Sequence, residues 1–484
     1  MSIHTVTTRQ LSERNGKPRL WIEGQRLKAS GFEPSAMFVI EPHQQGIVLK
    51  LVELGTNKVS RRERKEGRVD SIIDVGDIAA LAPLEGCKTL RVVWGEGQLY
   101  ISPLASELRL VRRLKRLKAR LMSGESLKTA GVASGGGVLD HAVHTGMERA
   151  GVSVSLHAFN EIREDLVEQA LEHNEFVTDK TVVLNMPLQE LAFDDCVLSR
   201  VGEVDVISLG LPCSGASVAG RAKRKTEVPE AHPDVGHLVA GAVAIIAKLN
   251  PACCIFENVK PWASSASAYI MRQQLRDMGY DIHERDMYGP DFGDLEARTR
   301  YSMVAVSRGI PFNFEDMPMP EVKPRKLAEV LESPEAVADR WSPMEGLKAK
   351  QERDKAEGKG FMMSIFTGEE DKIGCLTKGI AKNRSTDPKI QHPTNPDLLR
   401  VPTAREHAAC KGISPHLIEG MSQTKAHELL GQSITYGAFS TLGEYVANSL
   451  KSWAGSISNC ASSAVQQIRA AVQAGQEDLF KVAA

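Results

Sequence analysis

The sequence predicts an α/β fold with a parallel sheet in the middle of the chain and a separate β-rich domain before it. From Val132 to about Arg308, apolar runs that suit buried strands alternate with glycine turns and helical spacing, a rhythm typical of a parallel sheet. Residues 1 to about 100 hold short strand candidates between turn residues instead. A chain of 484 residues has room for several domains of about 150 residues each.

Composition places the chain among globular proteins. It is 42% apolar and 25% charged, and no apolar run approaches the roughly 20 residues that cross a membrane. The N-terminus lacks the features of a signal peptide, and the eight cysteines show no disulfide spacing. We therefore expect a cytoplasmic protein without a membrane partner. The net charge of −1 shows no overall basic excess.

Strands are expected before residue 105 at 19–24, 37–40 and 46–51, with a hairpin over 89–94 and 98–101. Residues 106–122 have helical apolar spacing on a basic background. The segment Leu20–Phe32 and the strands after it resemble the small swapped-hairpin domains of AbrB and SymE type. A domain that adds DNA affinity or forms a homodimer is compatible with these features.

Two neighbouring strands of the predicted sheet end in reactive side chains. The strand 204–209 stops at a Gly-Leu-Pro turn that presents Cys213, and the strand 252–256 leads into Glu257-Asn258-Val259. Ligands gather at the carboxyl ends of strands in open α/β sheets. A thiolate is the strongest nucleophile among protein side chains at neutral pH, and a carboxyl group can move a proton. The pair predicts an enzyme.

A glycine turn and an acidic residue predict a nucleoside cofactor. Ser134-Gly135-Gly136-Gly137 precedes a helix over 138–150, and the strand 153–159 ends in Asn160-Glu161. Glycine lets the backbone approach a ligand, and a carboxylate after the second strand can hold ribose hydroxyls. A full G-x-G-x-x-G is absent, which favours a cofactor without pyrophosphate.

Two arginines are further candidates for the active site. Arg298 and Arg300 come just before the expected strand 301–306, and side chains at i and i+2 of an extended chain point the same way. They are suited to an anion or a carbonyl. A basic run at 221–225 follows Cys213 closely.

Five ordered motifs resemble those of cytosine-C5 DNA methyltransferases. Gly210-Leu211-Pro212-Cys213-Ser214 is similar to the nucleophile loop, and Glu257-Asn258-Val259 to the Glu-Asn-Val motif. Glu296-Ala297-Arg298-Thr299-Arg300 resembles Gln-x-Arg-x-Arg, with Glu in place of Gln. Thr403–Gly412 and Gly431-Gln432-Ser433-Ile434 are similar to the two late motifs. The chain departs from the family in lacking Phe-Ala-Gly at the first motif and in carrying Asn185-Met186 where an acidic residue is usual.

The resemblance implies a Rossmann-like, S-adenosylmethionine-dependent methyltransferase fold with a smaller target-recognition domain. It implies methyl transfer to C5 of a flipped cytosine in double-stranded DNA through a Cys213 adduct, with Arg298 at the base carbonyl. The implied division is an N-terminal β-rich domain (1–105), a basic helical linker (106–130), a catalytic domain (131–308), a target-recognition region (309–400), a C-terminal return (401–453) and a helical tail (454–484).

The site residues expected on these grounds fall into three groups, and no metal ligand is among them. The catalytic group is Cys213, Glu257, Arg298 and Arg300. The cofactor-binding group is Gly135, Gly137, Glu161, Ile162, Asn185, Met186, Pro212, Gln432 and Ser433. The DNA-binding group is Ser217, Arg221, Lys223, Arg224, Lys225, Arg384 and Lys389.

Two other functions stay open at this level. One is an RNA (tRNA) cytosine-C5 methyltransferase of the same fold, and the other is a DNA-binding regulator with a vestigial methylase domain. The retention of Cys213, Glu257, Arg298 and Arg300 together favours an active enzyme. A cognate restriction enzyme and a nucleoid-associated location are compatible with the DNA reading.

Overall fold

The computed structural model describes residues 5–43, 46–84, 87–212, 215 and 228–456. The chain divides into two compact units, Met1–Arg112 and Arg113–Ala484. Within the described residues, no helix is both long enough and apolar enough to cross a membrane.

The first unit is built from two antiparallel sheets. A six-stranded sheet has the order β1-β9-β10-β5-β4-β6 and a four-stranded sheet the order β2-β3-β8-β7. The expected hairpin is present as β9 and β10, and Leu20, Phe38 and Trp94 lie in the apolar core. The elements are β1 (Thr5–Gln10), β2 (Ser12–Arg14), β3 (Lys17–Glu23), α1 (Gln25–Ala29), β4 (Met37–His43), β5 (Gly46–Val52), β6 (Asn57–Lys58), β7 (Ser60–Glu63), β8 (Val69–Val75), α2 (Ile78–Leu81), β9 (Thr89–Gly95) and β10 (Gln98–Pro103).

A seven-stranded sheet forms the centre of the second unit, in the order β13-β12-β11-β14-β15-β17-β16. The strands are β11 (Leu127–Val132), β12 (Val154–Asn160), β13 (Val182–Leu184), β14 (Val206–Leu209), β15 (Cys253–Asn258), β16 (Tyr280–Tyr288) and β17 (Thr299–Ser307). The predicted parallel sheet is confirmed for β11 to β15, whereas β17 and β16 pair antiparallel. The connection between β16 and β17 is too short for a parallel crossover.

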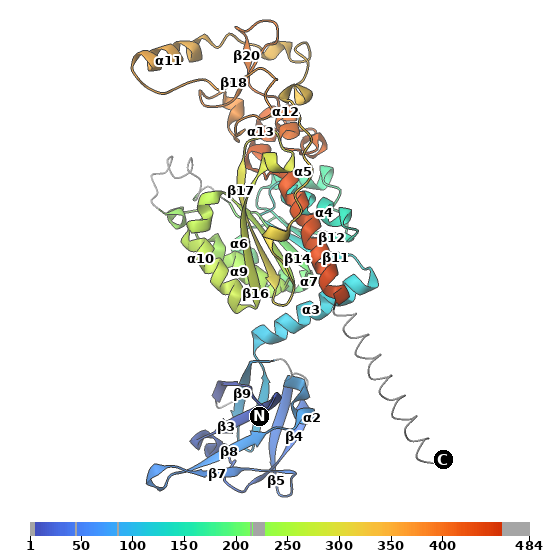
Figure 1. Ribbon diagram of the computed structural model, residues 1–484, viewed down its shortest axis with the longest axis vertical. Helices are drawn as coiled ribbons and strands as arrows, with labels where there is room; N and C mark the ends of the chain where they lie inside the picture. The colour runs from blue at the N-terminus through green and yellow to red at the C-terminus, as the bar shows by residue number, and fades with distance from the viewer. Residues whose placement is uncertain (1–4, 44–45, 85–86, 213–214, 216–227, 457–484) are drawn as a thin grey trace, which may run out of the picture. The chain divides into compact units, whose positions relative to one another are not determined.

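Helices cover both faces of this sheet, because neighbouring residues of each buried strand point to opposite faces. Val206 packs in one apolar cluster and Ile207 in the other. The first cluster holds α4 (Val138–Arg149) and a helix over 436–456, and the second holds α6 (Leu188–Leu191), α7 (Asp195–Val201), α9 (Leu238–Leu249) and α10 (Ala266–Asp277). Figure 1 shows α9 and α10 on the side of the sheet opposite α4. The expected tail lies outside the described residues beyond residue 456.

Arginines in the second half of the basic helix α3 (Ala105–Ser123) make hydrogen bonds and an ion pair within the second unit. Arg113 is buried and donates to Ser307 Oγ at 2.7 Å and to the Gly279 carbonyl at 2.8 Å. Arg116 Nε lies 2.9 Å from the buried Asp205 carboxylate. These contacts anchor the start of the second unit to the far end of its sheet.

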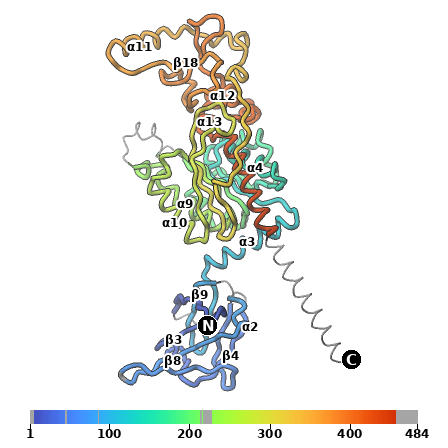
Figure 2. Tube along the Cα trace, in the orientation of Figure 1, coloured from blue at the N-terminus to red at the C-terminus, as the bar shows by residue number. Residues whose placement is uncertain are grey.

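Residues 309–400 leave the sheet after β17 and build a small region with its own apolar cluster, which includes Leu327, Leu376 and Ile390. Its elements are α11 (Glu345–Ala356), β18 (Ile365–Phe366), β19 (Lys389–Gln391) and β20 (Leu399–Arg400). The chain then returns through α12 (Ala404–Cys410) and α13 (Gln423–Gln432), as Figure 2 shows. Helix α13 and the helix over 436–456 are separated by a short break around Ile434.

Candidate active site

A cavity of about 400 Å³ opens at the carboxyl ends of β11, β12, β14 and β15. Seven of the nine residues expected to bind a cofactor line this cavity; they are Gly135, Glu161, Ile162, Met186, Pro212, Gln432 and Ser433. Glu257 and Arg300 line it too. One cavity therefore collects the ends of four strands and the segment after α13.

The glycine turn forms one wall. Gly137 caps α4 with a φ of 75°, and a Cβ at this position would lie 2.5 Å from Asn174 Nδ2. Only glycine fits both the left-handed backbone and this close approach. Gly135 also has a positive φ of 58°, but the space where its Cβ would lie is open. Gly137 is thus behind the wall, and Gly135 lines the cavity.

The acidic residue after β12 is held by backbone groups. The Gly135 amide donates to Glu161 Oε2 at 2.8 Å, and the Arg163 amide donates to Glu161 Oε1 at 2.9 Å. Each carboxylate oxygen can accept a further hydrogen bond. Asn185 lies behind the wall, where its side-chain amide donates to the Glu161 carbonyl at 2.9 Å.

These residues fit a nucleoside. A fixed carboxylate suits ribose hydroxyls, and Ile162 leaves 62% of its surface exposed although it is a large apolar residue on the cavity wall. Such an apolar surface suits one face of a purine ring. The volume of about 400 Å³ lies in the ordinary range for small-molecule pockets.

Glu257 lines the cavity at the end of β15, and Arg300 is its partner. Arg300 Nε lies 2.6 Å from Glu257 Oε1, and both side chains are almost fully buried. Burial raises the pKa of Glu257, against the opposing effect of the Arg300 charge. A Glu257 carboxyl with a raised pKa can hold a proton and donate a hydrogen bond to a ligand.

Arg298 corrects one expectation about the arginine pair. It comes just before β17, and its guanidinium donates to Glu296 at 3.0 Å and to the Leu376 carbonyl at 2.8 Å. It is buried and is not part of the cavity wall. Arg298 therefore ties β17 to the 309–400 region, and Arg300 takes the place at the cavity that we expected for Arg298.

Glu296 and Lys411 form a buried ion pair that the sequence motifs did not predict. Lys411 Nζ is fully buried and lies 2.8 Å from Glu296 Oε2, and the Leu376 amide donates to Glu296 Oε1 at 2.6 Å. Glu296 thus accepts from three partners that come from different segments. The glutamate in place of the usual glutamine was the signal in the sequence, since the added charge needs a cationic partner.

The loop with the expected nucleophile is held at its start. Asn258 Nδ2 donates to the Leu211 carbonyl at 3.1 Å, so the Glu-Asn-Val motif fixes the turn before Pro212. Cys213 itself lies outside the described residues, as do Ser217, Arg221, Lys223, Arg224 and Lys225. The nearby cysteines of β15 are fully buried, and burial raises the pKa of Cys254 to about 12. Cys254 is therefore a neutral, inert thiol.

The two expected DNA contacts in the 309–400 region differ. Arg384 is exposed, so its side chain is accessible to a ligand. Lys389 is fully buried, and its ammonium donates to the carbonyls of Arg384 and Asp387 at 2.8 and 2.9 Å. The expectation that Lys389 binds DNA is thus wrong for this structure, because its charge already stabilises the turn before β19.

Comparisons with known proteins identify the family of the chain. The C-5 cytosine-specific DNA methylase family matches residues 141–446. The chain is 26% identical over 249 residues to the type II methyltransferase M1.ScrFI of Lactococcus lactis subsp. cremoris, which covers 50% of this chain and 61% of that protein. It is also 26% identical over 264 residues to the type II methyltransferase M.MspI of Moraxella sp, covering 52% and 58%.

A solved structure shares the fold. The S. pombe Dnmt2 methyltransferase superposes with a TM-score of 0.52 at 18% identity, covering 68% of this chain and 99% of that one. The sequence match spans about three-fifths of the length of the two bacterial methyltransferases.

Proposed function

Because the chain belongs to the C-5 cytosine-specific DNA methylase family, we propose that it transfers a methyl group from S-adenosylmethionine to C5 of a cytosine in a specific sequence of double-stranded DNA. The single observation that carries the proposal is the Glu257–Arg300 pair, which lines the same cavity as Gly135 and Glu161. The acid that would contact the cytosine and the residues that would bind the cofactor thus line one cavity.

The carbon to be methylated is a poor nucleophile, so the enzyme has to activate the ring. In this proposal the Cys213 thiolate adds to C6 of the cytosine, and Glu257 donates a proton-bearing hydrogen bond at N3. The raised pKa of Glu257 supports that role, since the carboxyl has to be protonated to donate. S-adenosylmethionine supplies an electrophilic methyl group. Loss of the C5 proton and elimination of Cys213 then restore the ring.

Arg300 positions this acid. Its Nε holds one Glu257 oxygen at 2.6 Å, and its Nη2 donates to the Ser433 carbonyl at 3.2 Å. We assign to Arg300 the contact with the base carbonyl, because of the pair Arg298 and Arg300 it is Arg300 that lines the cavity beside Glu257. A base stacked inside a duplex cannot enter a cavity at a sheet edge, so the cytosine is flipped out.

The basic run of Arg221, Lys223, Arg224 and Lys225 would contact phosphates, which adds affinity without sequence choice. Residues 309–400 would read the bases, with exposed Arg384 as a candidate contact. The proposal extends to a nucleoid-associated enzyme in the cytoplasm. A homodimer through the first unit and a cognate restriction enzyme are the partners it allows.

The test uses the full chain and tritiated S-adenosylmethionine. Duplex DNA should gain label, Cys213→Ser should abolish labelling, and Glu257→Gln should reduce it by at least about a hundredfold, in line with the loss of a general acid. Cys196→Ser is the matched control, because Cys196 is an exposed cysteine on α7, outside the cavity wall. It should label DNA like the unaltered protein.

Three outcomes would contradict the proposal. Labelling of tRNA with unlabelled DNA would indicate the RNA methyltransferase instead. Salt-dependent DNA binding without any labelling would indicate a regulator. Full labelling by Cys213→Ser would exclude the thiol adduct. Bisulfite sequencing of DNA from cells that express the chain would then show which cytosine is modified.

A further inference from the structure

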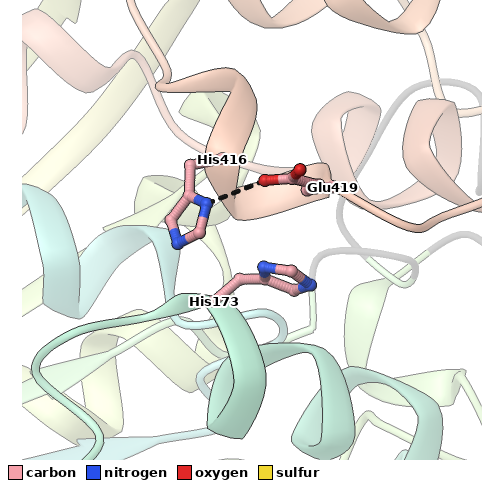
Figure 3. Close-up of side chains that lie close together, drawn as sticks. All are labelled: His173, His416 and Glu419. Carbon is pink, nitrogen blue, oxygen red and sulfur yellow. Dashed lines mark hydrogen bonds and ion pairs between the residues drawn. The ribbon is translucent and has the colours of Figure 1, made fainter.

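Two histidines and a glutamate converge at the junction between α5 (Glu164–His173) and the short helix η10 (Pro415–Ile418). His173 ends α5, His416 lies in η10, and Glu419 follows η10. Each residue offers one ligand atom, and these atoms lie within 4.8 Å of one another. Figure 3 shows the His173 ring extending toward the His416–Glu419 pair, in which His416 Nδ1 and Glu419 Oε2 are 3.0 Å apart.

His173 supplies a second, independent observation. It is only 9% exposed, and its Nδ1 atom is buried without a hydrogen-bond partner among the residues that the structure describes. An unsatisfied buried polar atom destabilises the fold unless a ligand or water satisfies it. The other ring nitrogen, Nε2, lies 3.7 Å from the exposed Glu172 carboxylate.

The backbone at this junction is already fixed. Gln169 on α5 donates to the Leu417 carbonyl at 3.2 Å and to the Glu419 carbonyl at 3.0 Å. These two bonds hold η10 against α5, so the three candidate ligands meet on a preformed scaffold. Preformed support of this kind lowers the entropic cost of binding an ion.

We propose that His173, His416 and Glu419 bind a divalent transition-metal ion, with zinc(II) as the ion that this ligand set suits best. Two imidazoles and one carboxylate, with water as the fourth ligand, form a tetrahedral zinc site with one open position. Two ligands of one such ion lie roughly 3.3–3.5 Å apart, which is close to the 3.0 Å between His416 and Glu419. Rotation of these two exposed side chains closes the gap to His173.

The bound ion would connect α5 to η10, two elements close to the cofactor-binding part of the cavity. Helix α5 directly follows Glu161 and Ile162 on the cavity wall, and η10 belongs to the segment that returns after residues 309–400. None of the three ligands lines the cavity among the described residues. The ion therefore stabilises the fold around the cofactor and takes no part in methyl transfer.

The test titrates the chelator-dialysed full chain with zinc chloride by calorimetry and with cobalt(II) by absorption spectroscopy. His416→Ala and Glu419→Gln are the variants of choice, because these side chains are 56% and 65% exposed and the fold does not depend on them. Each should weaken zinc binding by more than the roughly 10–100-fold that loss of a residue supporting a ligand costs, and remove the zinc-dependent rise in Tm. The cobalt spectrum should show no thiolate charge-transfer band.

Glu175→Gln is the matched control. Glu175 is 63% exposed and pairs with His141 Nε2 at 3.1 Å. It is therefore an exposed glutamate paired with a histidine, as Glu419 is, but it lies outside the cluster of three candidate ligands. It should bind zinc like the unaltered protein. Unchanged zinc affinity in both His416→Ala and Glu419→Gln would overturn the proposal, as would a cobalt–thiolate band that places the ion on a cysteine. Neither result depends on methyl transfer, so the proposed activity is tested separately.

Discussion

Glu296→Gln is the substitution that tests the buried charge network most directly. It restores the residue that the motif usually carries and keeps the size and shape of the side chain. In the structure, however, Glu296 accepts from Arg298 at 3.0 Å and from Lys411 at 2.8 Å, and all three groups are buried. Burial would raise the pKa of Glu296, but Lys411 and Arg298 lower it below its usual value. Glu296 is therefore charged in the folded protein.

The magnitude follows from the charges that remain. Glu296→Gln leaves two buried cations without an anion between them, and removing one partner of a buried pair costs about 3–5 kcal/mol. Lys411→Met costs less, because Glu296 keeps Arg298. The double variant has the same local net charge as the unaltered chain. Its loss should be smaller than the sum of the single losses, by about 1–3 kcal/mol.

Equilibrium urea denaturation of the full chain at pH 7, followed by tryptophan fluorescence, measures these free energies of unfolding. Trp262, Trp341 and Trp453 report on the second unit. The reasoning is refuted if Glu296→Gln unfolds within about 1 kcal/mol of the unaltered chain, or if the two single losses simply add.

Four further substitutions test the glycine turn, the cavity wall and a buried carboxyl group of α4. Gly137→Ala should lower Tm more than Gly135→Ala in thermal denaturation. Both substitutions add left-handed backbone strain of about 1–2 kcal/mol, but a Cβ at position 137 would also lie 2.5 Å from the Asn174 side chain, whereas the space at position 135 is open. Equal Tm values for the two variants would contradict this. Ile162→Ala should weaken S-adenosylmethionine binding about tenfold in calorimetry with little change in Tm, since this side chain is 62% exposed in the fold; a large fall in Tm would speak against a binding role. Burial raises the pKa of Asp140 to about 7, whereas the unfolded chain has an Asp pKa of about 3.9. Because the folded protein binds the proton more tightly, the free energy of unfolding falls as the pH rises between these two values, by at most about 1.4 kcal/mol per pH unit. Asp140→Asn should flatten that slope, and an unchanged slope between pH 5 and pH 7 would count against it.

The arrangement of the site along the sheet could be predicted from local patterns. The strand before Glu161, the strand before Pro212 and the strand that carries Glu257 were recognisable as apolar runs. Their ends meet at one edge because β11 to β15 are parallel. The family and the α/β fold with a β-rich first unit are confirmed by the comparisons and the observed sheets.

The partners of single side chains could not be predicted in this way. Arg298 and Arg300 share a spacing that suggests one direction, yet β17 begins only at Thr299, so Arg298 turns to Glu296 and Arg300 to Glu257. Lys389 has the chemistry of a phosphate contact, but the turn before β19 buries it.

Local patterns therefore predict which residue types lie at the carboxyl edge of the sheet, because strand period and turn position are local properties. The direction of β16 and β17, the Glu296–Lys411 pair and the proximity of His173 to His416 and Glu419 became evident from the folded chain alone. Each of these joins segments that are far apart along the chain or depends on how a loop closes. Such contacts depend on packing and charge compensation in three dimensions, for which no spacing within one segment carries a signal.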